Sequence, residues 1–294
     1  MPTEREDMID KEAPVCLVTG ASSGIGRVIA VEMAKAGFRV VVTGRHPERT
    51  AETARLAGGA ESVVADLADL AEVRDLADHM TRNHTRLDVL VNNAAMIRSG
   101  RAVSRDGYEL TWAVNYLAPF LLTNRLLDLL KAGAPARIVN VTSAVQGFGK
   151  LDFDDLQFER RDYAPMGAYA QSKLALVMFS FELAKRLEGA GVTANAIHPG
   201  GARTSLGRDI DPSDLGLLSK LIDPLIKVLT PATERTAKAP LYLATGPTGV
   251  TGEYFGGYLY NPLPPRPRRA NRLAKDLAAR ERLWNLSLKM TGLG

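Results

Sequence analysis

The stretch TGASSGIG, residues 19–26, decides the fold of this chain. It follows the apolar run VCLV and precedes a segment with helical periodicity. Its three glycines allow a tight turn, close approach of a phosphate to the backbone amides, and close packing of a helix on a strand. The amides at the start of that helix direct the favourable end of the helix dipole at the phosphate. This turn predicts a βαβ unit that binds a dinucleotide. The residues expected to contact the dinucleotide are Gly20, Ser22, Ser23, Gly24, Ile25 and Gly26.

Short apolar runs alternate with longer alanine-rich, amphipathic segments along the rest of the chain. We expect strands at 15–20, 38–44, 61–67, 87–94, 136–143 and 192–200, and helices near 25–36, 47–57, 69–82, 108–131 and 168–188. Nearly continuous apolar strands that alternate with helices are typical of parallel sheets covered on both faces. A seventh strand is expected at 252–260, after a helix that starts at Pro231. The pattern predicts a single α/β domain of the Rossmann type, with a doubly wound parallel sheet of about seven strands.

The predicted organisation is a polar arm (1–12), a catalytic domain (13–261) and a tail (262–294) that opens as a basic linker and continues as a helix. Two segments interrupt the alternation. Residues 144–167 form an insertion, and residues 201–230 a predicted substrate lid whose leucines line the pocket or, alternatively, cover the sheet or a subunit contact. The basic run is interpreted as a solvated linker, with an anion-binding or membrane-surface patch as the alternative; it contains Arg266, Arg268, Arg269 and Arg272.

The composition argues against several classes of protein. Of 294 residues, 46% are hydrophobic and 24% charged, which is ordinary for a globular chain, and the net charge of +4 does not indicate nucleic acid binding. The single cysteine, Cys16, excludes an internal disulfide, and the four scattered histidines show no metal-ligand spacing. No apolar run is long enough to span a bilayer, and the first residues do not resemble a signal peptide. We therefore expect a cytoplasmic protein without a metal ion.

The end of the second predicted strand indicates which dinucleotide is bound. NAD sites carry an acidic residue at this position to hold the ribose diol. Here the strand VVVTGRH ends in Gly44 and Arg45. Arg45 can pair with a 2′-phosphate, and this favours NADP(H) over NAD(H). The alternative is that Arg45 is a solvated loop cation.

The stretch GAYAQSKLAL (167–176) places Tyr169 one helical turn before Lys173. Hydride transfer from a nicotinamide to a carbonyl leaves an alkoxide that needs a proton. A free phenol has a pKa of about 10, and a nearby ammonium favours the phenolate. We therefore expect Lys173 to lower the pKa of Tyr169 toward a useful value. Ser143, at the end of the fifth predicted strand, can reach the same point.

Seven motifs, in order, resemble the short-chain dehydrogenase/reductase family over about residues 13–260. The resemblance implies that Tyr169 is the acid/base, that Lys173 holds the nicotinamide ribose, that Ser143 hydrogen-bonds the substrate oxygen and that Asn115 anchors a water of the proton relay. The plainer alternatives are a core aromatic for Tyr169, a strand-end cap for Ser143 and a polar helix contact for Asn115. The motifs are TGASSGIG (19–26), DL (66–67), NNAA (92–95), VNYLAPFLLT around Asn115, IVNVTS (138–143), YAQSK (169–173) and HPG (198–200).

The same resemblance implies further cofactor contacts. Two residues flank the adenine, two line the cofactor near its ribose, and three border the nicotinamide. In that order they are Asp66 and Leu67, Asn92 and Ala94, and Pro199, Gly200 and Thr204.

The spacing of 26 residues between Ser143 and Tyr169 is longer than in many family members. With the context RDYAPMGAYAQSKLA and the tail ERLWNLSLKMTGLG, it resembles the retinol dehydrogenase and protochlorophyllide reductase subgroup. That subgroup implies NADP(H) and a large apolar substrate. The expected substrate pocket consists of Ser143, Val145, Phe148, Tyr169 and Leu206.

The sequence thus predicts an NADP(H)-dependent carbonyl reductase or alcohol dehydrogenase for a bulky, mostly apolar ketone, aldehyde or alcohol. One alternative is a non-catalytic NADP(H)-binding sensor or scaffold, which would not need the intact set of Ser143, Tyr169 and Lys173. An epimerase or dehydratase of the same fold is the other, and the absence of a large C-terminal substrate domain argues against it. The resemblance implies a homodimer or homotetramer, unless the long tail blocks one of the usual contacts.

Overall fold

The computed structural model describes residues 13–200, 233–247, 249–256 and 264–294. Its strands form one sheet in the order β3-β2-β1-β4-β5-β6-β7-β8. The strands are β1 Val15–Thr19, β2 Arg39–Gly44, β3 Glu61–Val64, β4 Val89–Asn92, β5 Ala136–Val141, β6 Val192–His198, β7 Tyr254–Gly256 and β8 Arg266–Pro267. Every neighbouring pair from β3 to β7 is parallel. The prediction of a doubly wound parallel sheet is confirmed, with β8 as an additional strand.

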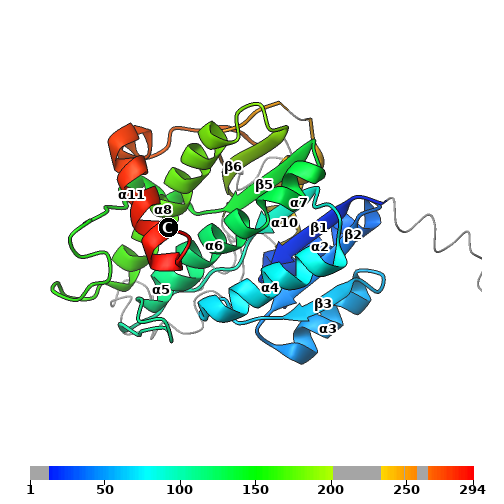
Figure 1. The fold of residues 1–294 in the computed structure, drawn as a ribbon, viewed down its shortest axis with the longest axis horizontal. Helices are drawn as coiled ribbons and strands as arrows, with labels where there is room; N and C mark the ends of the chain where they lie inside the picture. The colour runs from blue at the N-terminus through cyan, green and yellow to red at the C-terminus, as the bar shows by residue number, and fades with distance from the viewer. Residues whose placement is uncertain (1–12, 201–232, 248, 257–263) are drawn as a thin grey trace, which may run out of the picture.

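Strand β1 is an inner strand of the sheet, with β2 on one side and β4 on the other (Figure 1). The chain order therefore reverses between β1 and β4. In open α/β sheets, ligands bind outside the carboxyl ends of the strands at this switch point. The turn predicted from TGASSGIG lies directly there, because it joins β1 to the helix α2, Gly24–Lys35.

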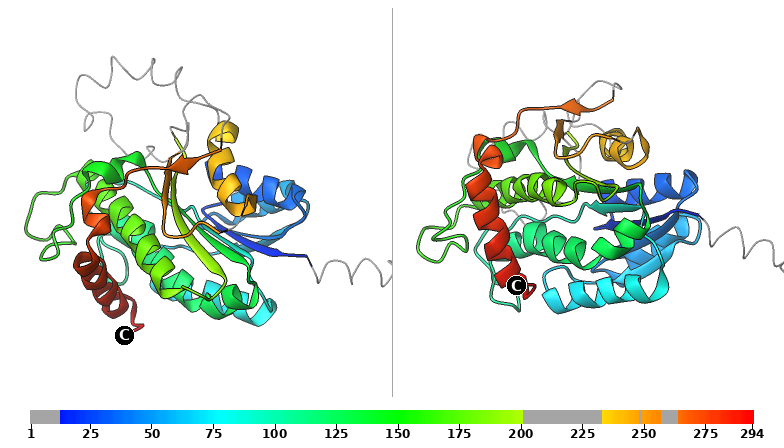
Figure 2. Two further views of the ribbon diagram at one scale, coloured as in Figure 1. Left: turned by 90° about the horizontal axis from the view of Figure 1, so that it is seen from above. Right: turned by 45° about the horizontal axis from the view of Figure 1, so that its top comes forward.

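Helices cover both faces of the sheet. On one face, α2 packs against α10 (Thr233–Thr245), with α3 (Pro47–Leu56) beside it, over a core that includes Ile29, Met33 and Ala237 (Figure 2). On the other face lie α4 (Leu70–Asn83), α6 (Ala118–Arg125) and α8 (Pro165–Arg186). The two cores are built from alternate residues of the same strands, which explains why each strand is apolar throughout.

The helix predicted as continuous over 108–131 is wrong in detail, because the structure divides it. It comprises α5 (Leu110–Trp112), a π-helical turn η1 (Ala113–Leu117), α6, and α7 (Leu127–Ala132). Pro119 has no amide hydrogen to donate to Asn115, so the α-helical ladder cannot run through this point. A π-helical turn is one way in which a chain absorbs such a break, and these turns are frequent at functional sites. Asn115 lies in this turn.

The tail was predicted to open as a solvated linker, and this is wrong for its backbone. Arg266 and Pro267 form β8, which pairs antiparallel with β7, and Arg268 donates from its backbone N to the Tyr254 carbonyl at 2.7 Å. The arginine side chains themselves are exposed. A short 3-10 helix η5 (Arg272–Lys275) and the helix α11 (Leu277–Thr291) follow.

Helix α11 lies beside α8, at the far side of the molecule from β3 (Figure 1). Trp284 stacks on Phe179 of α8 with ring centroids 5.9 Å apart and meets Phe120 of α6 edge-on at 5.0 Å. Tyr116 and Ser287 share a buried hydrogen bond of 2.7 Å between their hydroxyls. The tail is therefore part of the hydrophobic core rather than an appendage.

Candidate active site

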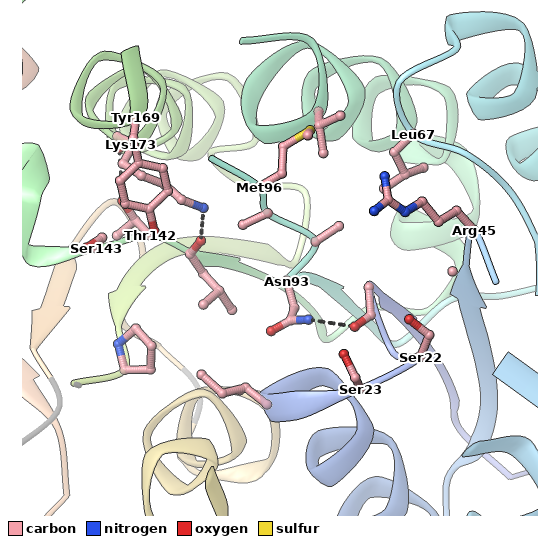
Figure 3. Close-up of a pocket in the computed structure, with 18 of the residues that line it drawn as sticks. Ser22, Ser23, Arg45, Leu67, Asn93, Met96, Thr142, Ser143, Tyr169 and Lys173 are labelled. Atoms are coloured by element: carbon pink, nitrogen blue, oxygen red, sulfur yellow. Dashed lines mark hydrogen bonds between the residues drawn. The ribbon is translucent and has the colours of Figure 1, made fainter. Parts of the chain in front are cut away.

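A pocket of about 430 Å³ lies at the carboxyl ends of the strands (Figure 3). Residues from the loops after β1 to β6 and from α8 line it. Most of the residues predicted to hold a dinucleotide or to act in catalysis meet there. Those in the lining are Gly20, Ser22, Ser23, Ile25, Arg45, Asp66, Leu67, Ala94, Ser143, Tyr169, Lys173, Pro199 and Gly200.

The turn after β1 is fixed by the loop after β4. Gly20 has a φ of +64°, and a Cβ at this position would lie 2.7 Å from the Ala94 Cα. A Cβ at Gly26 would lie 2.4 Å from Nδ2 of Asn93, which itself donates to the carbonyls of Thr19 at 2.9 Å and Gly20 at 3.3 Å. Gly24 and Gly26 do not line the pocket. They allow the turn and its packing, and Gly20 is the glycine of the three that faces the cavity.

One end of the pocket carries positive charge. Arg45 lines it from the end of β2, together with His46 and Arg49 from the start of α3. Among the lining residues that the structure describes, Asp66 supplies the single carboxylate, and its Oδ1 accepts from the Ala68 backbone N at 3.0 Å. Two guanidinium groups beside a glycine-rich turn fit the phosphates of a dinucleotide, which carry several negative charges.

The other end of the pocket brings Ser143, Tyr169 and Lys173 together (Figure 3). Lys173 is almost fully buried, and its Nζ donates to the Val141 carbonyl at 3.0 Å and lies 5.8 Å from the centroid of the Tyr169 ring. Thr142 donates from Oγ1 to the Lys173 carbonyl at 2.9 Å. These bonds fix α8 against the end of β5, so Tyr169 and Lys173 face the cavity from one side and Ser143 from the strand end.

The expectation that Lys173 lowers the pKa of Tyr169 is not met in this structure. Burial raises the pKa of Tyr169 to about 12, against a hydrogen bond with Ser143 that acts in the opposite direction. Burial also lowers the pKa of Lys173 to about 7, so the amine carries only part of a charge near neutrality. Sequence spacing places the two groups on one helix face, but it contains no information on how deeply they are buried.

Two predicted asparagines, Asn92 and Asn115, do not line the pocket. Asn115 donates from Nδ2 to the Met96 carbonyl at 2.8 Å, accepts from the Met96 backbone N at 2.8 Å, and donates to Ser172 Oγ at 3.1 Å. Its side chain thus joins the loop after β4 to α8, as in the alternative of a polar helix contact. Asn92 is buried and donates to Asn140 at 2.8 Å and to Thr123 at 3.0 Å.

Asn93 takes the place in the pocket that was predicted for Asn92. Asn92 is the last residue of β4, and its side chain is held by Asn140 and Thr123 inside the protein. Asn93 is the first residue of the loop after β4, which lines the pocket at the carboxyl end of the sheet. Sequence reasoning also missed Arg49, Met96, Val114, Thr142 and His198, all of which line the pocket. Four of the missed residues lie within the quoted motifs, namely Asn93 in NNAA, Val114 in VNYLAPFLLT, Thr142 in IVNVTS and His198 in HPG. The motifs therefore marked the right segments, but they did not show which residue of each segment lines the pocket.

The structure does not place Phe148 or Val145 in the pocket lining. Phe148 is 63% exposed, and Val145 is half-buried. Both belong to a 3-10 turn, η2 (Ala144–Phe148), which buries Gln146 instead. Thr204, Leu206 and the rest of the predicted lid lie outside the described residues.

The family model described as short chain dehydrogenase matches residues 14–214. The chain belongs to the short-chain dehydrogenase family. Members of this family are oxidoreductases that bind a nicotinamide cofactor. The predicted resemblance to this family is thereby confirmed, and the retinol dehydrogenases among the curated relatives confirm the retinol dehydrogenase-like subgroup.

Among curated relatives, retinol dehydrogenase 13 of Mus musculus is 39% identical over 94% of this chain and 83% of its own length. Retinol dehydrogenase 12 of Homo sapiens is 38% identical over 95% of this chain and 86% of its own length. An uncharacterised protein of Mycobacterium paratuberculosis has a crystal structure that superposes with a TM-score of 0.77, at 33% identity and 96% coverage of each chain. The Pseudomonas aeruginosa protein RhlG, solved as an active-site complex with NADP, has a TM-score of 0.65 at 31% identity, over 84% of this chain and 96% of its own.

Two further findings concern the described part of the chain. Its helices include none that is long and apolar enough to cross a membrane. Within the same ranges, no group of three or more histidine, cysteine, aspartate or glutamate side chains is arranged to hold a metal ion.

Proposed function

We propose that this short-chain dehydrogenase is an NADP(H)-dependent carbonyl reductase or alcohol dehydrogenase for a bulky, mostly apolar substrate. The observation that carries the proposal is the meeting of Ser143, Tyr169 and Lys173 in the same pocket as the glycine-rich turn. A sensor or scaffold would need the turn but not this set of hydroxyl, phenol and amine groups. The bound nicotinamide would supply or accept the hydride.

The charges at the other end of the pocket support NADP(H). Arg45 and Arg49 line the pocket beside the end of β2, where an NAD site would carry a carboxylate. A 2′-phosphate brings two negative charges that two guanidinium groups can pair with. RhlG, whose solved complex contains NADP, is similar to this chain over most of its length. We infer that Arg45 and Arg49 together read the 2′-phosphate.

Tyr169 would act as the acid in reduction and as the base in oxidation. Because burial raises its pKa to about 12, the phenol keeps its proton at neutral pH and is ready to donate it to a reduced oxygen. Ser143 would donate or accept a hydrogen bond at the substrate oxygen, and hydrogen bonding to Ser143 opposes the effect of burial on the pKa of Tyr169. Lys173 would hold the cofactor ribose and, through Val141, the end of β5.

The substrate class rests on the relatives. Two of them are named retinol dehydrogenases, and retinol is a long, apolar alcohol. An apolar ligand also agrees with Met96, Val114 and Val141, which contribute apolar side chains to the lining of the pocket. We propose an apolar aldehyde or ketone, or the corresponding alcohol, without distinguishing a retinoid from a steroid, terpenoid, polyketide-type ketone or fatty aldehyde.

A substrate panel tests the proposal. The purified protein is incubated with NADPH and apolar aldehydes and ketones, retinaldehyde among them, and NADPH absorbance is followed. We expect substrate-dependent loss of NADPH with at least one of them, and much slower loss with NADH. Tight NADPH binding without turnover of the panel, or of the corresponding alcohols with NADP⁺, would instead identify a binding module.

A further inference from the structure

Asn271 lies in the tail, but its hydrogen bonds go to the turn that follows Ser143. Its backbone N donates to Oε1 of Gln146 at 3.0 Å. Its Nδ2 lies 3.1 Å from the carbonyls of both Gln146 and Gly147 and 3.0 Å from that of Gly149. Its Oδ1 accepts from the Leu273 backbone N at 2.9 Å and so begins η5. The side-chain amide of Asn271 thus hydrogen-bonds three carbonyls, two within η2 and one at Gly149, the residue that follows it.

The turn needs such support, because a 3-10 helix of five residues makes few hydrogen bonds of its own. Inside it, Gln146 donates from its backbone N to the Ser143 carbonyl at 3.2 Å, and Gly149 to the Gln146 carbonyl at 3.1 Å. Ser143 is the N-cap residue, and its Oγ accepts from the Val145 backbone N at 3.5 Å. The position of the Ser143 hydroxyl is therefore coupled to the geometry of η2.

The opposite side of the turn rests on α8. A Cβ at Gly149 would lie 2.6 Å from the carbonyl oxygen of Ala170, the residue after Tyr169. Gln146 is only 2% exposed, and its side chain also hydrogen-bonds Tyr254 of β7. The turn is thus enclosed between the helix that carries Tyr169, the edge of the sheet and the tail.

Asn271 is itself held at a fixed position. On its N-terminal side, β8 pairs with β7, and Ala270 is buried. On its C-terminal side, Ala274 is fully buried, and α11 is anchored through Trp284 between Phe120 and Phe179. Because Asn271 is fixed on both sides, its side-chain amide can hold the carbonyls of η2 in place.

We propose that Asn271 is a positioning residue for Ser143, so that the C-terminal tail completes the active site without touching substrate or cofactor. The inference rests on the proposed function, because it assigns Ser143 to the substrate oxygen. It predicts that loosening Asn271 affects the chemical step and leaves NADPH binding intact, since the glycine-rich turn and Arg45 lie at the other end of the pocket.

The test compares Asn271→Ser with Asp276→Ala in the full chain. Serine keeps an oxygen that can cap η5 but lacks the amide donors. Asp276 caps α11 by accepting from the Ala279 backbone N at 3.0 Å, so its loss weakens the tail without removing a contact to η2. We expect Asn271→Ser to lower kcat on the order of tenfold or more with unchanged NADPH affinity. Asp276→Ala should keep the kcat of the unmodified chain.

A second variant and a second measurement protect the test against misfolding and against failure of the proposed function. Asn271→Asp keeps the shape and the cap but turns an oxygen toward three carbonyls, so it should lose at least as much activity.

Hydrogen exchange needs no turnover: in both Asn271 variants the amides of Val145, Gln146 and Gly149 should exchange faster, and in Asp276→Ala they should not. Unchanged exchange of these amides, or equal losses of kcat in Asp276→Ala and Asn271→Ser, would overturn the positioning role. Absence of any turnover in the unmodified chain would overturn the proposed function, while exchange would still decide whether Asn271 holds the turn.

Discussion

Lys173 donates a hydrogen bond of 3.0 Å from Nζ to the carbonyl oxygen of Val141, which ties the middle of α8 to the last residue of β5. The lysine is thus a structural bond between helix and strand as well as a candidate for cofactor binding. The same bond places Tyr169, one helical turn earlier, over the carboxyl edge of the sheet. The arrangement leads to predictions about the tyrosine, its pKa, the cofactor and the stability of the fold.

Tyr169→Phe removes the hydroxyl that would carry the proton and keeps the ring that packs in the pocket. We expect turnover to fall by at least about 100-fold, because general acid–base catalysis contributes on that scale. NADPH affinity, measured by fluorescence titration, should stay close to that of the unmodified chain. Near-normal turnover in this variant would remove Tyr169 from the proposed mechanism.

The pKa of Tyr169 sets the pH dependence of the two directions. With a pKa of about 12, the phenolate fraction grows about tenfold per pH unit through the neutral and mildly alkaline range. We therefore expect kcat/KM for alcohol oxidation to climb from about pH 7 to about pH 10, while carbonyl reduction, which uses the protonated phenol, does not gain over that range. A plateau of oxidation near about pH 8 would mean that the pKa of Tyr169 in the working enzyme is far lower.

Arg45→Asp should change the preferred dinucleotide. It removes one of the guanidinium groups at the end of β2 and introduces a carboxylate that suits a ribose diol. The ratio of kcat/KM for NADPH over NADH should fall by roughly ten- to hundredfold, the equivalent of one charge-assisted hydrogen bond. Arg55→Asp is the matched control, because Arg55 is exposed on α3 and does not line the pocket. An equal change in both variants would show a general charge effect rather than recognition of a 2′-phosphate.

A carboxylate paired with two histidines at the edge of the sheet predicts a loss of stability at low pH. Glu61 on β3 hydrogen-bonds His79, and also His84 at 3.0 Å. Hydrogen bonds to the two histidines lower the pKa of Glu61 from its usual 4.5 to about 2. Since the folded pKa is the lower one, its contribution is complete above about pH 4.5 and is lost as the pH falls toward about 2.

Glu61→Gln should therefore reduce the free energy of unfolding by about 1 kcal/mol at neutral pH, because the pair is partly exposed and screened. The difference from the unmodified chain should shrink as the pH falls below about 4. Urea unfolding at several pH values measures it, with the exposed Glu281→Gln as control. A difference that stays constant down to about pH 2 would contradict the assigned pKa.

Trp284→Ala tests the role of the tail in the core. The indole fills the space between Phe120 and Phe179, and its removal should cost about 3–5 kcal/mol of unfolding free energy. Exposed Leu277→Ala on the same helix should cost far less. Similar unfolding curves for the two variants would mean that α11 is not integral to the fold.

By the same reasoning, deletion of residues 270–294 should destabilise the whole domain and not only alter KM.

The sequence predicted the sheet well, because that signal is local. Apolar β-branched runs and the turn at Gly20 contain the information for strand, turn and helix within a few residues. The gathering of Ser143, Tyr169 and Lys173 in one pocket follows, since parallel strands end at one edge and Lys173 lies one turn from Tyr169 on the same helix.

The remaining features depend on contacts that no local pattern contains. Asn92 and Asn93 are chemically identical, and which of them lines the cavity depends on where β4 ends and on the buried partners of Asn92. Phe148 looked like a pocket aromatic, but the η2 turn exposes it and buries Gln146. The pKa of Tyr169 follows from burial, which depends on the whole fold. The strand β8 has two residues, too few to produce a periodic signal.

The bonds between Asn271 and the turn after Ser143 join residues 122 to 125 positions apart in the chain. Contacts of such large sequence separation form late, since the entropy of closing the intervening loop must be paid first. A ribosome makes the glycine-rich turn long before it makes Asn271. The nascent protein can thus assemble a nucleotide cleft well before the neighbourhood of Ser143 is fixed, and enzymatic competence waits until Asn271 has been made.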